Sequence, residues 1–154
     1  MSPIAPSRQP DDRLRQILAH QGISRRFFSA LPARRAERGG VAGLDLVVRL
    51  TSYRSLPLSC IAGIEIAIDG APVDPAGLRL IVDGIDYTLA ELGGLSGRWW
   101  FILDNALLFV PCARIESDLR VDGTLLTVEP YITAGRFTFR ASDSRVVTLG
   151  EISV

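Results

Sequence analysis

The side chains that could do acid–base or nucleophilic chemistry are few in this chain. His20 is the only histidine, and all 17 basic residues are arginine, so there is no lysine. A Schiff base and a P-loop lysine are therefore excluded, and a Ser-His-Asp triad would depend on His20 alone. His20 falls within a predicted N-terminal helix, where a surface position is the simpler interpretation.

Two pairs of carboxylates lie close enough in sequence to be considered as a general acid and a general base. These are Asp83 with Asp86 and Glu116 with Asp118. Acidic residues beside turns are also what turn chemistry favours. Nothing in the spacing selects either pair, so we predict no catalytic residue in this chain.

The two cysteines, Cys60 and Cys112, are too few for a disulfide framework. Each adjoins apolar residues, so we interpret both as small, reduced, buried hydrophobes rather than as nucleophiles. The chain has no CxxC or HExxH motif and a single histidine, so we predict no metal site in it.

Two local features combine aromatic and arginine side chains. Tyr53 and Arg54 precede Pro57, which removes a ladder donor and indicates an edge strand or a loop. Trp99 and Trp100 are adjacent on a predicted strand, so they point to opposite faces and one of them lies outward unless that face is covered. An outward tryptophan near arginine is typical of interfaces and sugar sites, although ordinary strand packing explains the pattern equally well.

Charge divides the 154 residues, enough for one domain, into two parts. Residues 1–40 hold eight arginines against three acids, whereas residues 41–154 hold nine arginines against 14 acids. We predict a partly disordered basic extension over 1–40, with a short helix after Asp11 and Asp12 and a linker over 33–40. The formal net charge of zero argues against a nucleic-acid partner.

From residue 41 onward, apolar and polar residues alternate with the period of a half-buried strand. The predicted strands cover 44–51, 64–68, 78–82, 85–89, 99–103, 106–110, 125–132, 136–140 and 146–152. Three Asp-Gly pairs, at 69–70, 83–84 and 122–123, predict tight turns. No helical pattern separates the strands, so we predict an all-β antiparallel β-sandwich over 41–154, with a small barrel as the alternative.

The sequence predicts neither a membrane-spanning segment nor an export signal. No apolar run reaches the ~18 residues that span a bilayer. Ser24–Phe28 resembles a twin-arginine export signal, but the apolar stretch that such a signal needs does not follow. We therefore expect a cytoplasmic protein without a membrane partner.

Six segments of the predicted β-domain carry a family resemblance. They are Val48–Ile61, whose most specific piece is Tyr53–Ser59, then Ile64–Gly70, Tyr87–Leu92, Trp99-Trp100, Asp104–Ala106 and Pro130–Ile132. In this order they resemble the β (small) subunit of C-glycoside deglycosidases, over about residues 41–154. Cys112–Asp118 stands where that family often has a glycine-rich stretch, and residues 1–40 have no counterpart.

The resemblance implies a β-sandwich subunit that pairs with a larger TIM-barrel α subunit in a hetero-oligomer. The α subunit is implied to hold a divalent metal, commonly manganese, so this chain would need no cofactor of its own. The assembly would be a carbon–carbon lyase of carbohydrate metabolism that separates a sugar from an aromatic aglycone. A separate oxidoreductase would first make the 3-oxo sugar, because a ketone acidifies the neighbouring C–H and allows elimination.

From this resemblance we expect five side chains to contact the α subunit or to form the rim of a glycoside pocket near the interface. They are Tyr53, Arg54, Trp99, Trp100 and Tyr131. Arg54 could donate to a substrate oxygen or to a carboxylate of the α subunit. Two other interpretations stay open: a stand-alone carbohydrate-binding β-sandwich module without catalysis, and a hydrolase built on a carboxylate pair.

Overall fold

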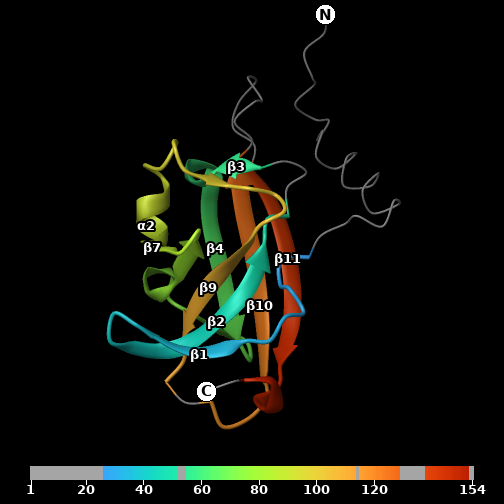
Figure 1. Cartoon of the computed structure of the whole chain (residues 1–154). Helices are drawn as coiled ribbons and strands as arrows, with labels where there is room; N and C mark the ends of the chain where they lie inside the picture. Colours follow the sequence, from blue (N-terminus) through green and yellow to red (C-terminus); the bar gives the residue numbers. More distant parts are fainter. Residues whose placement is uncertain (1–25, 52–54, 114, 129–137, 153–154) are drawn as a thin grey trace, which may run out of the picture.

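The computed structural model describes residues 26–51, 55–113, 115–128 and 138–152, and these fold into antiparallel sheets (Figure 1). One sheet has five strands in the order β1-β2-β9-β6-β7, a second has four in the order β11-β10-β4-β5, and β3 pairs with β8. The strands are β1 (Arg34–Arg38), β2 (Val41–Arg49), β3 (Leu56–Pro57), β4 (Ile61–Ile68), β5 (Ala71–Pro72), β6 (Arg79–Val82), β7 (Ile85–Thr88), β8 (Trp99–Trp100), β9 (Asn105–Pro111), β10 (Leu119–Val128) and β11 (Thr138–Val147). The predicted all-β sandwich is thereby confirmed, whereas the helix expected after Asp11 lies outside the described residues.

The core lies between the two larger sheets and follows the period-two alternation of the strands. In β2, Leu44, Leu46 and Val48 are buried, while Asp45 and Val47 occupy the opposite face. Fully burying one such side chain contributes roughly 1.5–3 kcal/mol. The alternation therefore fixes which face of each sheet turns inward.

Two of the three predicted Asp-Gly turns are confirmed. Asp83 and Gly84 join β6 to β7 with φ angles of 53° and 78°, and Asp69 and Gly70 join β4 to β5 with φ angles of 48° and 83°. Positive φ at both central residues matches the right-handed twist of the flanking strands. These two hairpins therefore form where the local sequence favours them.

The third Asp-Gly pair is not a turn, and that prediction is wrong. Asp122 and Gly123 lie in the middle of β10, paired with β4 on one side and β11 on the other. A Cβ atom on Gly123 would lie 2.5 Å from Cζ of Phe28, so glycine is needed here for close packing of the ring. A contact with a distant residue, rather than turn chemistry, explains this glycine.

The sheet also begins earlier than the sequence indicates, because the linker predicted over 33–40 is wrong. Arg34–Arg38 form β1, and Gly39 and Gly40 make a tight turn into β2 with φ angles of 58° and 79°. Phe27 and Phe28 are buried in the core, and Phe28 bridges to Val48. The run of arginines lies on an edge strand, where charge discourages pairing with another chain.

Other differences concern element boundaries. Residues 138–140 and 146–147 of two separately predicted strands belong to one strand, β11, which ends before a 3-10 turn at Leu149–Glu151. The apolar positions that would reveal its alternation are occupied by small or charged residues. Only two residues of the 99–103 segment form a strand.

A short helix, α2 (Leu89–Leu92), follows β7 and was not predicted. Its capping box, in which Thr88 and Glu91 bond to each other's backbone amides, starts the helix. Among the described residues, no helix has the length and apolar character to cross a membrane.

Candidate functional site

One end of the sandwich is built around the two adjacent tryptophans. β3 pairs with β8 so that Leu56 lies opposite Trp100 and Pro57 opposite Trp99. Trp100 is fully buried (0% exposed), and its indole Nε1 donates to the backbone oxygen of Asp104 at 3.1 Å. Trp99 is partly exposed, so the alternation predicted for the pair holds.

Beyond Trp100 the chain turns and presents two apolar side chains to solvent. Phe101 is 52% exposed and Leu103 84% exposed. The turn is held by the Ile102 N–H, which donates to Oγ of Ser55 at 2.8 Å, and by Asp104 N–H to the Phe101 oxygen at 3.0 Å. We call β3, β8 and residues 101–104 the aromatic end. A fixed turn that carries exposed apolar side chains is suited to contact with another protein.

Three of the five predicted site residues, Tyr53, Arg54 and Tyr131, lie outside the described residues. Ser55, which follows Arg54 directly, belongs to the aromatic end through its bond to Ile102. Leu56 and Pro57 of β3 follow, so the aromatic end contains described residues of the most specific piece of the family resemblance.

The described chain on either side of Tyr131 ends near the same place. Val128 and Thr138 face each other as the last pair of the β10–β11 ladder. The preceding Thr127 pairs with Ile61, which follows the 3-10 turn Leu58–Cys60 after β3. The last described residues on either side of the segment that contains Tyr131 are thus close to the start of β4, which follows β3 and the 3-10 turn.

The predicted carboxylate pairs are tied to structural partners. Asp86 accepts from Arg38 and Arg79, each at 3.4 Å, while Asp83 occupies the β6–β7 turn. Asp118 accepts the Leu149 N–H at 2.7 Å. Fold contacts and turn geometry therefore account for the positions of three of the four carboxylates.

The cysteines fit the prediction of small hydrophobes. Cys60 is buried, Cys112 is partly buried against the core, and they form no disulfide. Within the described ranges, no group of three His, Cys, Asp or Glu side chains is arranged to hold a metal ion.

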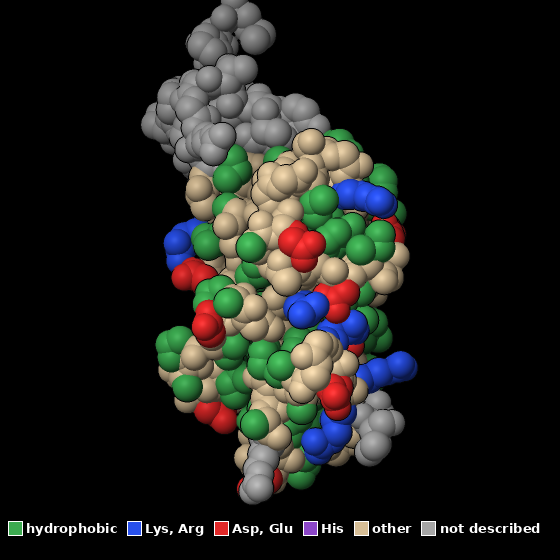
Figure 2. All heavy atoms as spheres, turned by 90° about the vertical axis from the view of Figure 1, so that its left-hand side faces the viewer, with side chains coloured by type: hydrophobic (Ala, Val, Ile, Leu, Met, Phe, Trp, Pro, Cys, Tyr) green, Lys and Arg blue, Asp and Glu red, His purple; other side chains and the backbone are tan. Residues whose placement is uncertain are grey.

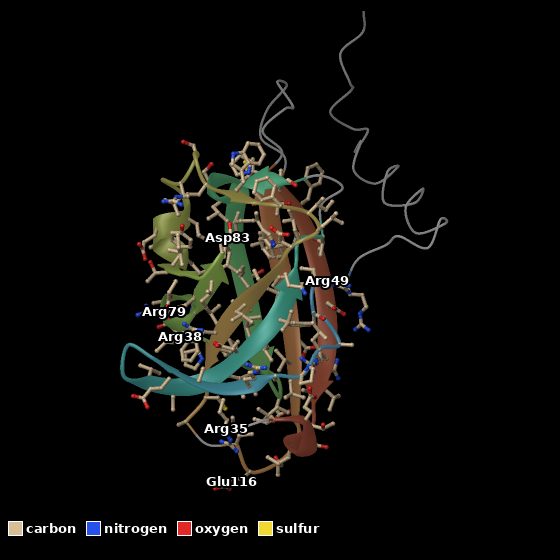
Figure 3. All side chains as sticks on the ribbon, viewed as in Figure 1. Arg35, Arg38, Arg49, Arg79, Asp83 and Glu116 are labelled. Carbon is tan, nitrogen blue, oxygen red and sulfur yellow. The ribbon has the colours of Figure 1, made fainter. Side chains whose placement is uncertain are left out.

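The outer face of the five-stranded sheet carries an ion-pair network that the sequence did not reveal. Arg38 binds Asp45 through two hydrogen bonds, at 3.1 and 2.7 Å, and also reaches Asp86, which Arg79 contacts from β6. The bidentate bond to Asp45 raises the pKa of Arg38 above its ordinary value. Arg38 and Arg79 lie side by side in Figure 3, and acidic and basic side chains stand close together on this side of the molecule in Figure 2. Each of these four charged side chains therefore has a partner of opposite charge within the network.

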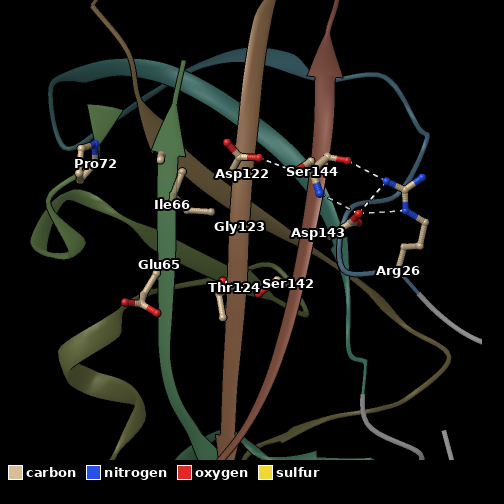
Figure 4. A pocket seen from close by; sticks show the side chains of 11 residues that line it. Arg26, Glu65, Ile66, Pro72, Asp122, Gly123, Thr124, Ser142, Asp143 and Ser144 are labelled. Carbon is tan, nitrogen blue, oxygen red and sulfur yellow. Dashed lines mark hydrogen bonds and ion pairs between the residues drawn. The ribbon is translucent and has the colours of Figure 1, made fainter. Parts of the chain in front are cut away.

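A broad polar groove of about 750 Å³ runs over the outer face of the four-stranded sheet (Figure 4). The Ser144 hydroxyl donates to the Asp122 carboxylate and, with Arg120, holds the pKa of Asp122 below its usual range. Thr124 and Ser142 share a hydrogen bond of 2.9 Å across the strands. No aromatic side chain is among the described residues that line the groove, so stacking of a sugar ring is not favoured here.

The model of the family described as C-glycoside deglycosidase beta subunit matches residues 28–114. A C-glycoside deglycosidase beta subunit of Microbacterium trichothecenolyticum is 46% identical over 87 residues, which cover 55% of this chain and 66% of that relative.

Two further relatives extend the match. A 3'-dehydrocarminate deglycosidase beta subunit of a Microbacterium species is 36% identical over 92 residues, covering 59% of this chain and 70% of the relative. A C-glycoside deglycosidase beta subunit of Arthrobacter globiformis is 37% identical over 99 residues, covering 62% and 72%. The chain is similar to all three over most of their length.

Proposed function

Since the chain belongs to the C-glycoside deglycosidase beta subunit family, we propose that it is the small subunit of a hetero-oligomeric C-glycoside deglycosidase. In this proposal the larger α subunit is a TIM barrel that holds a divalent metal, with manganese as the first candidate. The complex is a lyase that cleaves the C–C bond of a 3-oxo-C-glycoside. The name of one relative, 3'-dehydrocarminate deglycosidase beta subunit, supports an oxidised sugar as the substrate class.

The observation that carries the structural part of the proposal is the exposure of the aromatic end. Phe101 and Leu103 present apolar surface next to Trp99, and the turn that holds them is fixed by Ser55 and Trp100. Buried apolar contacts of this kind dominate the energy of protein interfaces. We assign this end to the contact with the α subunit and the rim of the glycoside pocket.

The five predicted site residues would have different roles at this end of the molecule. Trp99 would contact the α subunit or the glycoside directly. Trp100 is buried, so it would act as a positioning residue that holds the 101–104 turn. Tyr53, Arg54 and Tyr131 stay predicted contacts, with Arg54 as a donor to a substrate oxygen or to an α-subunit carboxylate.

The first test is co-expression of this chain with whichever neighbouring open reading frame most resembles a TIM barrel, followed by light scattering to measure the mass of the assembly. We expect one hetero-oligomer, and turnover of 3-oxo-C-glucosides when manganese is added. Separate elution of the two proteins would contradict the proposal. Sugar binding by this chain alone would then favour the stand-alone carbohydrate-binding module.

A matched pair of variants locates the contact. Leu103→Asp places a charge on the aromatic end and is expected to weaken α-subunit binding at least about tenfold. Val41→Asp places the same charge on an exposed apolar residue at the β1–β2 turn and is expected to leave binding unchanged. Equal effects of the two substitutions on the dissociation constant would move the contact away from the aromatic end.

Arg54→Ala tests the polar part of the assignment. We expect the variant to fold and to join the complex, while turnover of the 3-oxo-C-glucoside falls. Unchanged turnover and unchanged affinity for the α subunit would remove Arg54 from the site.

A further inference from the structure

A second cavity, of about 410 Å³, lies where the segment Arg26–Ala30 passes between the two larger sheets. One wall is this segment, which bridges to β2 through Phe28 and Val48, and the other is Ser144–Val146 of β11 with Glu151 from the 3-10 turn. Arg49, the last residue of β2, completes it. We call this cavity the arginine cleft.

Three arginines reach the arginine cleft, and two of them already have acidic partners. Arg26 binds Asp143 through Nε at 3.0 Å and Nη2 at 2.6 Å. Arg145, whose side chain is only 10% exposed, pairs with Glu151 through Nη2. In the described part of the chain, the Arg49 guanidinium has no ion-pair partner.

The two acids that pair with Arg26 and Arg145 also accept hydrogen bonds from the backbone. Asp143 also accepts the N–H groups of Phe28 and Ser144. Glu151 also accepts the N–H groups of Thr148, at 2.9 Å, and Ala33, at 3.4 Å. Neither carboxylate is left to neutralise Arg49, so the arginine cleft carries one positive charge in excess.

Two arginine N–H groups are buried in this region without a hydrogen-bond acceptor among the described residues. They are Nε of Arg49 and Nη1 of Arg145. A buried donor on a charged group is costly to leave unpaired, so the arrangement needs an acceptor that the described chain does not supply. Ser29, also buried, accepts the Leu31 N–H with its hydroxyl oxygen and so keeps its own proton to donate.

From these observations we propose that the arginine cleft binds a small oxyanion, a phosphate or a carboxylate group. The planar guanidinium presents N–H donors in a fork that matches two oxygens of such a group. The anion would neutralise the excess charge of Arg49 and accept from the buried N–H groups of Arg49 and Arg145. The Ser29 hydroxyl is placed to donate as well.

The arginine cleft is separate from the aromatic end. Thr138 starts β11 beside Val128, whereas Ser144 lies six residues further along the strand, which is about 20 Å at the usual rise per residue. Figure 1 shows the 3-10 turn that carries Glu151 at the end of the sandwich opposite β3. Anion binding here is thus independent of the proposed contact with the α subunit.

The test uses the full chain with inorganic phosphate and, separately, acetate as probes, at constant ionic strength set with chloride. Calorimetric titration and the thermal unfolding midpoint are measured for the native chain, Arg49→Met, Arg49→Lys and the control Arg98→Met. Arg98 is an exposed arginine beside the aromatic end, so its substitution removes the same charge elsewhere.

We expect at least one probe to bind the native chain and to raise its unfolding midpoint. Arg49→Met should weaken that binding at least tenfold, Arg49→Lys should weaken it less, and Arg98→Met should leave it unchanged. Without either probe, Arg49→Met should unfold at the native temperature or above, because it removes a buried Nε–H that has no acceptor among the described residues. Absence of binding by both probes, or equal loss in Arg49→Met and Arg98→Met, would overturn the proposal.

Discussion

The aromatic end and the arginine cleft differ in which kind of side chain the β-sandwich exposes and which kind it buries. At the aromatic end, a buried Trp100 fixes a turn whose apolar side chains remain in solvent. At the arginine cleft, the Arg145 side chain is buried and held by Glu151, while Asp143 holds the exposed Arg26 at the rim. The first region exposes what is ordinarily buried, and the second buries what is ordinarily exposed.

The difference shows in how each region is connected to the core. The aromatic end is anchored by one large ring and by hydrogen bonds within a short stretch of chain. The arginine cleft joins residues more than a hundred positions apart, as in the bond from Arg26 to Asp143. Substitutions should therefore act by loss of packing at the first region and by loss of polar partners at the second.

The largest expected effect is at the aromatic end. Trp100→Ala removes a fully buried ring and the hydrogen bond to Asp104, and should lower the free energy of unfolding by about 3–5 kcal/mol. Trp100→Phe keeps most of the packing and should cost clearly less. Urea unfolding of the three proteins measures this, and equal stability of Trp100→Ala and the native chain would contradict the role of this anchor.

A smaller loss of stability is expected where the N-terminal segment enters the core beside the arginine cleft. Gly123→Ala places a Cβ atom against the Phe28 ring and should cost about 1–3 kcal/mol through overpacking. Phe28→Leu in the same chain should recover part of this loss, because the smaller side chain leaves room. A double-mutant cycle in urea measures the coupling, and additive effects would show that the two residues do not clash.

The sequence carried enough information to predict the elements that depend on local pattern. The alternation of Leu44, Leu46 and Val48 predicts a half-buried strand, and Asp83-Gly84 predicts its hairpin, because both signals are short-range. The opposite faces of Trp99 and Trp100 follow from the same period of two.

What the sequence could not predict depends on contacts between distant residues. Gly123 lies in a strand because Phe28 packs against it, although the local pair Asp-Gly favours a turn. The arginine cleft unites Arg26, Arg49 and Arg145 only after the segment before β1 has paired with β2. The exposed turn at the aromatic end was not predicted, because the apolar residues over 99–103 indicate one continuous strand.

An intermediate loss of stability is expected from substitution of Asp143, the acid that binds Arg26 beside the arginine cleft. Asp143→Asn weakens the bonds from Arg26 and from the Phe28 N–H, and should lower stability by about 1–2 kcal/mol. It also leaves Arg26 without its counter-charge, so phosphate should bind more tightly than to the native chain. Unfolding and phosphate titrations check both parts, and weaker phosphate binding would show that Asp143 positions Arg26 for the anion rather than competing with it.

The smallest expected effect is at the capping box of α2, next to the aromatic end. Hydrogen bonds from the backbone and hydroxyl of Thr88 hold the pKa of Glu91 below its ordinary value of 4.5. The folded-state pKa is therefore lower than the unfolded one, so this contribution to stability is present above about pH 4.5 and is lost as the pH falls through the folded-state value. Glu91→Gln should remove this part of the pH dependence. Between neutral and acidic pH, the thermal unfolding midpoint should fall slightly less for Glu91→Gln than for the native chain. As a control, near-UV circular dichroism should show that Trp100 stays buried in both proteins. A decline of the same slope in both proteins would mean that the capping box, unlike the anchor at Trp100, does not add to the stability of this end.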